Sequence, residues 1–257
     1  MLDLNTILAK FKPISLEEID NVKLMNRMDN KFLIHIDKLY PLIERIESKY
    51  QILEIDGRRL LHYQTIYYDT ATRQMYYAHH NNRLNRLKIR YREYLDTKTA
   101  FLEIKYKTNK DRTIKERIKQ KADLPFINHK NEKFISKKTG YKLSDLVPSL
   151  INRFNRFTLV NTEDKVRITI DMNLSFVNKE DIINMSNLVI LEVKQEKSSN
   201  SEFLRLLHEF KIYPRSISKY CIGTVLFNKE IKYNRFKKNL LILKKIINDY
   251  KFPHLSN

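Results

Sequence analysis

Several segments of the chain alternate charged with apolar residues at the two-residue period of a β-strand. The clearest segments are 86–92 (RLKIRYR), 101–107 (FLEIKYK), 165–171 (KVRITID) and 191–194 (LEVK). Most of the charged positions are Arg or Lys, with isolated Glu or Asp among them. If these strands share one sheet, one face carries many cations and a few carboxylates. Such a face needs a compensating polyanion, and the carboxylates suggest a metal ion beside it.

The same patterns predict further elements on both sides of these strands. Strands are expected near 27–35, 50–55, 60–69, 86–95, 99–107, 112–119, 153–161, 165–174 and 187–195. Helices are expected after the N-cap Ser15 and near 37–49, 72–80, 123–137, 143–150, 201–211, 218–227 and 235–250. Successive strands joined by short polar turns favour an antiparallel sheet. The sheet must cover its apolar face with helices or close on itself, so the fold class is α+β.

The chain shows no long linker, repeat or low-complexity segment, so one large domain is the simplest organisation. We place this domain at residues 1–228 and a basic helical C-terminal appendage at 229–257. The appendage has eight Lys or Arg residues against Glu230 and Asp249, a net charge of +6. It therefore explains only part of the total charge of +19.

Composition restricts the class of protein and its partners. Hydrophobic residues make up 42% of the 257 residues, and only three Gly and six Pro are present, which indicates a globular protein. The large positive charge makes polyanions the natural partners, namely nucleotides, polyphosphate, nucleic acid or an anionic membrane surface. No segment is long and apolar enough for a membrane span, and no signal peptide is evident. The single Cys221 excludes an internal disulfide, fits a reducing compartment and favours a cytoplasmic location.

The spacing of the cations suits the chemistry of phosphate. Lys88, Arg90 and Arg92 lie on one strand face at intervals of about 6.6 Å. Similar sets occur at Arg27 and Lys31, at Glu103, Lys105 and Lys107, at Lys115 and Arg117, at Arg167 and Asp171, and at Glu192 and Lys194. Phosphoryl transfer needs cations that neutralise the non-bridging oxygens and a divalent metal that bridges adjacent phosphates. With three glycines in the chain, a glycine-rich phosphate loop is excluded, so side chains must build the site.

Several of these residues also have simpler interpretations. The charged faces could be solvated strand faces, although the same pattern on five strands disfavours this. Glu103 could be an ion-pair partner or a metal ligand. Glu192, between two apolar residues, is favoured as a ligand of Mg²⁺ or Mn²⁺. A metal site at His79 and His80 is disfavoured because adjacent residues of a helix point in different directions. Ser218 could contact phosphate or cap a helix.

A set of motifs resembles a known family. In chain order they are 27–32 (RMDNKF), 66–70 (IYYDT), 88–92 (KIRYR), 101–105 (FLEIK), 167–171 (RITID), 191–194 (LEVK) and 218–220 (SKY). They resemble the VTC domain, the catalytic domain of the vacuolar transporter chaperone polyphosphate polymerase and its bacterial relatives. That domain belongs to the triphosphate tunnel metalloenzyme superfamily. The resemblance runs from about residue 19 to about residue 227.

The resemblance implies an antiparallel β-barrel tunnel with a basic interior, flanked by helices, and an essential divalent metal. It implies transfer of the ATP γ-phosphate onto a growing polyphosphate chain, so ATP and inorganic polyphosphate are the expected partners. The residues expected to grip phosphates are Lys31, Arg90, Arg92, Lys105, Lys115, Arg167 and Lys219, and Glu192 would hold Mn²⁺ or Mg²⁺. Further substrate-binding residues are expected to be Arg27, Glu103, Arg117, Arg156, Lys194 and Ser218.

Two other functions remain open beside the polymerase. A tunnel triphosphatase would need the same cations and metal, with water accepting the phosphoryl group. A non-catalytic module that binds polyphosphate or RNA would use the basic face alone, with bases stacked on aromatic side chains. Nucleic acid is the less favoured partner because Tyr91 and Tyr106 fall on the opposite face of their strands by parity. The polymerase is the leading hypothesis.

Overall fold

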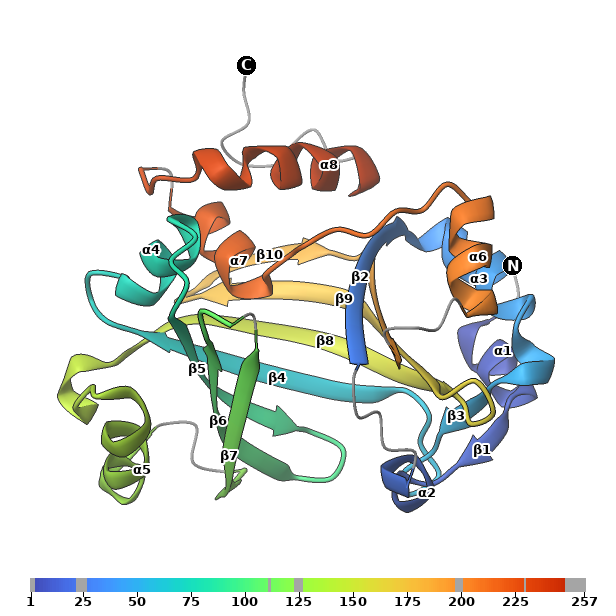
Figure 1. Cartoon of the computed structure of the whole chain (residues 1–257), viewed down its shortest axis with the longest axis horizontal. Coiled ribbons are helices and arrows are strands. Elements are labelled where there is room, and N and C mark those ends of the chain that lie inside the picture. Colours follow the sequence, from blue (N-terminus) through green and yellow to red (C-terminus); the bar gives the residue numbers. More distant parts are fainter. Residues whose placement is uncertain are drawn as a thin grey trace.

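The computed structural model describes residues 3–21, 27–110, 112–122, 127–196, 201–228 and 230–247. Its centre is an antiparallel sheet with the strand order β2-β11-β9-β8-β4-β5-β6-β7 (Figure 1). These strands are β2 (Arg27–His35), β4 (Leu61–Asp69), β5 (Arg86–Tyr94), β6 (Thr99–Lys107), β7 (Thr113–Lys121), β8 (Val147–Asn161), β9 (Val166–Asn178) and β11 (Leu188–Glu196). At its margins lie β1 (Lys12–Ile14), β3 (Gln51–Leu53) and β10 (Asp181–Met185). The predicted α+β class with an antiparallel sheet is confirmed.

The sheet curls so that one face is concave. Figure 1 shows the end strands β2 and β7 on the same side of the central strands β8 and β4. Among the described strands no backbone ladder joins β2 to β7, so hydrogen bonds do not close the sheet into the expected barrel. The curled sheet is nevertheless consistent with a tunnel fold, and its inner face carries the charged residues of the alternating strands.

Helices cover the outer face of β2, β9 and β11. They are α1 (Leu4–Lys10), α3 (Leu39–Glu44) and α6 (Glu202–Glu209). Alternate residues of the three strands point toward them, such as Phe32, Ile168 and Leu191, each at most 2% exposed. Their burial explains the period of two in the sequence, because every intervening residue then lies on the inner face.

A second apolar layer covers the outer face of β4, β5 and β6. It is formed by α5 (His129–Thr139) and by Met75 of α4 (Gln74–His80), which pack with Ile89, Leu102 and Ile104. Tyr91 belongs to this layer, and its hydroxyl donates to the backbone oxygen of Lys121 at 2.6 Å. The prediction that Tyr91 faces away from the basic residues is therefore confirmed.

The helix α7 (Lys219–Phe227) packs against the inner face of the sheet. It begins after Ser218, whose hydroxyl accepts a hydrogen bond from the backbone N–H of Cys221 at 3.3 Å. Gly223 lies so close to the sheet that a β-carbon there would stand 2.5 Å from Leu150 and 2.6 Å from Phe176. Glycine therefore lets α7 fill one part of the concave face with apolar side chains, and the charged residues occupy the rest.

The C-terminal helix α8 (Lys237–Ile247) follows the short 3₁₀ helix η4 (Asn234–Phe236). It packs onto β2 and β11 and buries Leu240, Leu243 and Ile247 in the same core as α7. The division into a domain and an appendage at residue 228 stays a prediction. Within the described residues, no helix has the length and apolar character needed to cross a membrane.

Several predicted elements differ from the structure. The helix expected at 143–150 is wrong: only η3 (Leu143–Asp145) is helical, and β8 begins at Val147. Pro148 explains the difference, because proline lacks the backbone N–H and disfavours helical geometry in the residue before it. The helix expected at 37–49 is broken into η1 (Ile36–Lys38), α3 and η2 (Glu47–Lys49).

Other differences concern element ends and short elements. The helix α5 begins at His129 rather than at 123, and residues 123–126 lie outside the described part of the chain. The N-terminal elements α1 and β1, and the hairpin strand β10, were not predicted at all. The helix α2 (Leu16–Asn21) follows Ser15 as predicted, and the Ser15 hydroxyl accepts from the backbone N–H of Glu18 at 3.2 Å.

Candidate phosphate-binding site

The inner face of β5, β6 and β7 brings the predicted cations side by side. Arg90 lies opposite Glu103 in the register, and Lys105 lies between Lys88 on β5 and Lys115 on β7. The Arg90 and Arg92 side chains belong to the buried set, with residue exposures of 9% and 8%. Residues that are directly opposite in an antiparallel pair share a face, so the register alone gathers these charges.

Glu103 is an ion-pair partner within this group. Its side chain is fully buried, and one carboxylate oxygen accepts from Arg90 Nε at 2.6 Å while the other contacts the Lys115 ammonium. Burial alone would raise the pKa of Glu103, but the Arg90 and Arg92 guanidiniums outweigh it and hold the pKa well below its usual range. Of the two interpretations of Glu103, the geometry therefore favours ion pairing over metal binding.

A second ion-paired group joins three segments that are distant in the sequence. Arg156 on β8 forms a two-point contact with Asp171 on β9, with distances of 2.5 Å for Nε–Oδ1 and 2.8 Å for Nη2–Oδ2. The Lys219 ammonium at the start of α7 contacts Asp171 Oδ2 as well. Burial opposes the charge on Asp171, but Arg156 and Lys219 outweigh this and hold its pKa well below the usual range. Asp171 thus anchors two of the proposed phosphate-binding cations.

Beneath these cations lies an aromatic floor that the sequence interpretation missed. Phe154 and Tyr63 stack with ring centroids 5.1 Å apart and an interplanar angle of 6°. Lys219 Nζ lies 3.6 Å from the Phe154 centroid, and the guanidinium carbons of Arg156 and Arg92 lie 5.2 Å and 5.7 Å from it. The ring faces attract the three cations and hold them near one another. Phe154 lies two residues before Arg156, so the period of a strand places both on the same face. This spacing was the sequence signal for the role of Phe154.

Of the three cations over Phe154, Arg92 forms its side-chain hydrogen bond with a neutral group rather than with a carboxylate. Its Nε donates to the Thr65 hydroxyl at 3.2 Å. Burial and the neighbouring Arg90 lower the pKa of Arg92, since both disfavour its charge. An anion that contacts Arg92 would relieve this repulsion without breaking an ion pair.

The third group surrounds Glu192 on β11. Glu192 Oε1 lies 3.2 Å from Lys194 Nζ and 3.5 Å from Lys31 Nζ. Burial would raise the pKa of Glu192, but Lys194 and Lys31 together lower it to about 2. Its side chain is 20% exposed, compared with 5% for Asp171 and none for Glu103. Glu192 is therefore the most accessible of the three carboxylates.

The oxygen atoms around Glu192 are the donors available to the divalent metal that the resemblance implies. Nowhere in the described ranges do three His, Cys, Asp or Glu side chains gather as a metal site. Across the register from Glu192, the buried Thr169 hydroxyl has no hydrogen-bond partner. Mg²⁺ commonly uses one or two carboxylates, with substrate phosphates and water as its other ligands. The residues fit a metal of that kind, and Glu192 is the residue that would hold it.

The remaining predicted residues lie around these groups. Lys88 Nζ donates to the Ser218 hydroxyl at 3.2 Å, so Ser218 caps α7 and orients a cation at the same time. Arg167 on β9 lies opposite Lys194. Arg117 is exposed on β7, with its guanidinium 4.6 Å from the Phe101 ring centroid. Arg27 begins β2, but its side chain lies outside the described part of the chain.

Burial and crowding of the cations should make the ligand-free protein more stable as pH rises. The pKa of Lys105 is lowered to about 6, first by Arg90 and then by burial. Burial lowers the pKa values of Lys88 and Lys219 to about 8. The unfolded chain binds protons at these lysines at higher pH than the folded protein does. The urea midpoint of unfolding should therefore increase between about pH 6.5 and 8.5.

The substitution Lys105→Met isolates this effect, because it removes the most strongly shifted lysine and keeps the length of the side chain. The increase in urea midpoint with pH should be smaller in K105M than in the wild type. The same substitution at the exposed Lys238 of α8 serves as the control and should leave the increase unchanged. A wild-type midpoint that is flat or falls over this pH range would contradict the proposed cation crowding.

The curled antiparallel sheet carries three groups of cations on its inner face, an arrangement that suits a polyanion. The VTC domain family matches residues 26–228 of the chain. The chain therefore belongs to the VTC domain family, and with it to the triphosphate tunnel metalloenzyme superfamily. No curated protein matches the sequence.

A putative adenylate cyclase from Vibrio parahaemolyticus is 12% identical, with a TM-score of 0.46, and covers 77% of this chain and 97% of its own. A putative adenylyl cyclase from Hippeastrum, described as having a dominant triphosphatase activity, is 11% identical, with a TM-score of 0.45, and covers 77% and 95%. The Schizosaccharomyces pombe RNA triphosphatase is 12% identical, with a TM-score of 0.26, and covers 89% and 88%. These similarities are too distant to assign an activity.

Proposed function

We propose that this protein is a metal-dependent polyphosphate polymerase that transfers the γ-phosphate of ATP onto a growing polyphosphate chain. The observation that carries the proposal is the cluster of Arg92, Arg156 and Lys219 over Phe154, on the inner face of a VTC domain. Each cation comes from a different element, and all three lie over the same Phe154 ring. A linear triphosphate has charge along its whole length and suits such a surface better than a single anion does.

In the proposed reaction, a terminal oxygen of the acceptor chain attacks the γ-phosphorus of ATP. The new P–O bond forms as the bond to the β-phosphate oxygen breaks, so ADP leaves and the chain grows by one phosphate. Arg92 and Lys219 would neutralise the oxygens of the transferred group, because charge stabilisation and positioning supply most of the rate in phosphoryl transfer. A divalent metal held at Glu192 would supply further neutralisation of adjacent phosphate oxygens.

The carboxylates make the site partly self-neutralising before substrate binds. Asp171 holds Arg156 and Lys219 in place, and Glu103 does the same for Arg90 and Lys115. Because these cations are already held in place, they lose little conformational entropy when they bind a phosphate chain. The site can therefore position the reacting phosphates accurately. The reducing compartment that the single Cys221 favours is consistent with a cytoplasmic location and with ATP as the substrate.

Incubation of the pure protein with ATP and Mn²⁺ tests the proposal. We expect ADP to accumulate together with inorganic polyphosphate, and free phosphate to be a minor product. The measurement is a simultaneous assay of all three products, with Mn²⁺ replaced by EDTA as the control. Release of free phosphate equal to ADP, with no polyphosphate, would assign the protein as a tunnel triphosphatase instead. Binding without any turnover would assign it as a polyanion-binding module.

A further inference from the structure

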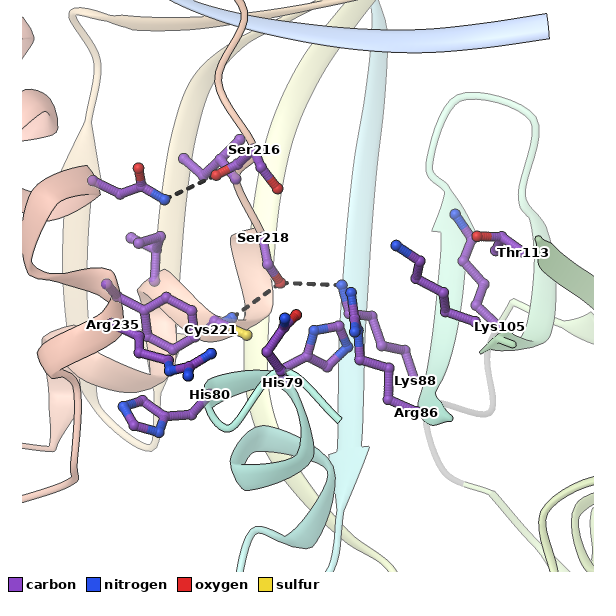
Figure 2. Close-up of a pocket in the computed structure, with 16 residues that line it drawn as sticks. His79, His80, Arg86, Lys88, Lys105, Thr113, Ser216, Ser218, Cys221 and Arg235 are labelled. Carbon is purple, nitrogen blue, oxygen red and sulfur yellow. Dashed lines mark hydrogen bonds between the residues drawn. The ribbon is translucent and has the colours of Figure 1, made fainter. Parts of the chain in front are cut away.

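A cavity of about 390 Å³ (Figure 2) lies next to the Arg90–Glu103 pair along β5 and β6. Its walls come from β5, β6, the start of β7, the end of α4, the segment before α7, the first turn of α7 and the C-terminal residues 235–239. Figure 2 shows Lys88 and Arg86 from β5 near Ser218, and Lys105 of β6 and Arg235 on opposite sides of the cavity. This cavity combines the family domain with a segment that follows it in the sequence.

The lining of this cavity differs in charge from the candidate active site. Five cations line it, namely Arg86, Lys88, Lys105, Lys107 and Arg235. No Asp or Glu is among its described lining residues. In the candidate active site, by contrast, the carboxylates Glu103, Asp171 and Glu192 neutralise part of the positive charge. Arg86, Lys88, Lys105 and Arg235 therefore give the cavity a positive lining that suits an external anion.

Burial and mutual repulsion both disfavour the positive charges of the groups that line the cavity. Burial is the main cause that lowers the pKa of Lys88 to about 8, and repulsion by Arg90 together with burial lowers that of Lys105 to about 6. Burial, with Lys88 and Arg86 nearby, lowers the pKa of His79 to about 2. A bound polyanion would offset the repulsion among these cations, which acts most strongly on Lys105, so Lys105 would take up protons with it.

The cavity is continuous with the candidate active site along two strands. Lys88 lies opposite Lys105, and the next inward pair along the same strands is Arg90 opposite Glu103. From Arg92 to Arg86 the inward-facing positions of β5 are all cationic, and the six-residue interval spans about 20 Å. This track is longer than three linked phosphates, so a ligand that fills it must be a longer chain.

The C-terminal segment is held firmly in its place on the cavity wall. The Phe236 ring packs edge-on against His80 and Tyr76, with centroid distances of 5.6 Å and 5.9 Å. Asn239 Nδ2 donates to the backbone oxygen of Ser216 at 2.8 Å. Arg235 directly precedes the first of these anchors, lines the cavity and has an exposed side chain. All three residues follow position 228, where the match to the VTC domain ends.

We propose that this cavity holds the distal part of an inorganic polyphosphate chain whose reacting end lies among Arg92, Arg156 and Lys219, and that Arg235 binds the chain there. The proposal rests on the proposed function, since it assigns one end of the chain to that site. It adds a role for the C-terminal segment: Arg235 retains chains that extend beyond the reach of the active site. Short triphosphates would not reach Arg235.

The substitution Arg235→Ala tests this assignment by comparing ligands of different length. Calorimetric titrations in EDTA at constant ionic strength would use tripolyphosphate, ATP and a longer inorganic polyphosphate with the full-length protein. We expect R235A to weaken binding of the longer chain about fivefold, as for the loss of one exposed charge contact. Binding of tripolyphosphate and ATP should stay within about twofold of the wild type. Lys238→Ala, which removes a nearby exposed charge outside the cavity, should change none of the three affinities.

The outcomes separate this proposal from the polymerase assignment. Equal weakening of all three ligands, or of none, would overturn the subsite. Selective weakening of ATP would assign the cavity to the nucleotide and also overturn it. If R235A weakens only the longer chain in a protein that makes no polyphosphate, the subsite stands and the polymerase assignment fails. If the protein makes polyphosphate but R235A binds the longer chain normally, the polymerase assignment stands and the subsite fails.

Discussion

Replacing Arg92 by alanine is expected to lower turnover of ATP by about 10²–10³-fold, the typical effect of losing one stabiliser of transition-state charge. Arg92 is the informative choice because its Nε hydrogen bond goes to the neutral Thr65 hydroxyl. Its removal leaves the pairs of Glu103 and Asp171 intact, so no buried carboxylate loses its own partner. The loss should appear mainly in kcat, measured as ADP release at saturating ATP and metal.

Two further variants show whether the loss of turnover depends on the position of Arg92 in the site and on the shape of its guanidinium group. Arg92→Lys keeps the charge but loses the planar fork that binds phosphate at two points, so it should recover only part of the activity. Arg153→Ala removes an exposed arginine of β8 that contacts Gln64 rather than the inner cations. R153A should leave turnover within about twofold of the wild type. Equal losses in R92A and R153A would place the site elsewhere.

Glu192→Gln is expected to abolish nearly all metal-dependent turnover while preserving metal-free phosphate binding. The substitution keeps the shape of the side chain but removes the negative charge that would hold Mg²⁺ or Mn²⁺. It also releases Lys31 and Lys194 from their ion pairs. Both lysines would then be available to a phosphate. Calorimetric titration with tripolyphosphate in EDTA should therefore show equal or tighter binding, beside a turnover assay with Mn²⁺.

A purely structural Glu192 predicts a different pair of results. Loss of its contacts with two lysines would then lower stability and weaken phosphate binding and turnover together. Retained turnover with an unchanged dependence on Mn²⁺ would remove Glu192 from the metal site altogether. Thermal unfolding of E192Q without ligand completes the comparison. If Glu192 is a metal ligand, the midpoint should change little, whereas a structural Glu192 predicts a lower midpoint.

The strand faces were predictable from the sequence because parity within a strand is a local property. Once Ile89 and Tyr91 turn toward a covering layer, Arg90 and Arg92 must turn the other way. The ion pairs were not predictable, since they depend on which strands become neighbours. Asp171 and Lys219 are 48 residues apart and meet only because α7 enters the concave face.

The roles of Phe154 in the aromatic floor and of Arg235 in the cavity wall could not be predicted from the sequence either. Phe154 looks like an ordinary core residue in sequence, and only the three cations above it reveal its part in the site. Arg235 looks like one of many charges in a basic tail, and only the packing of Phe236 brings it to the cavity. In both cases tertiary packing decides the role, because composition and periodicity describe single elements.

The insertion of α7 into the concave face determines when the site can form during synthesis. Lys219 is supplied by a helix that leaves the ribosome after all the strands, and β2, made early, must wait for β11 as its neighbour. Contacts between such distant segments form slowly and leave partly folded chains exposed. A nascent or truncated chain therefore carries the basic strands without the helix that completes the site. Such fragments would expose the basic strands to cellular polyanions before the site is complete, so the residues from Lys219 onward are needed for productive folding.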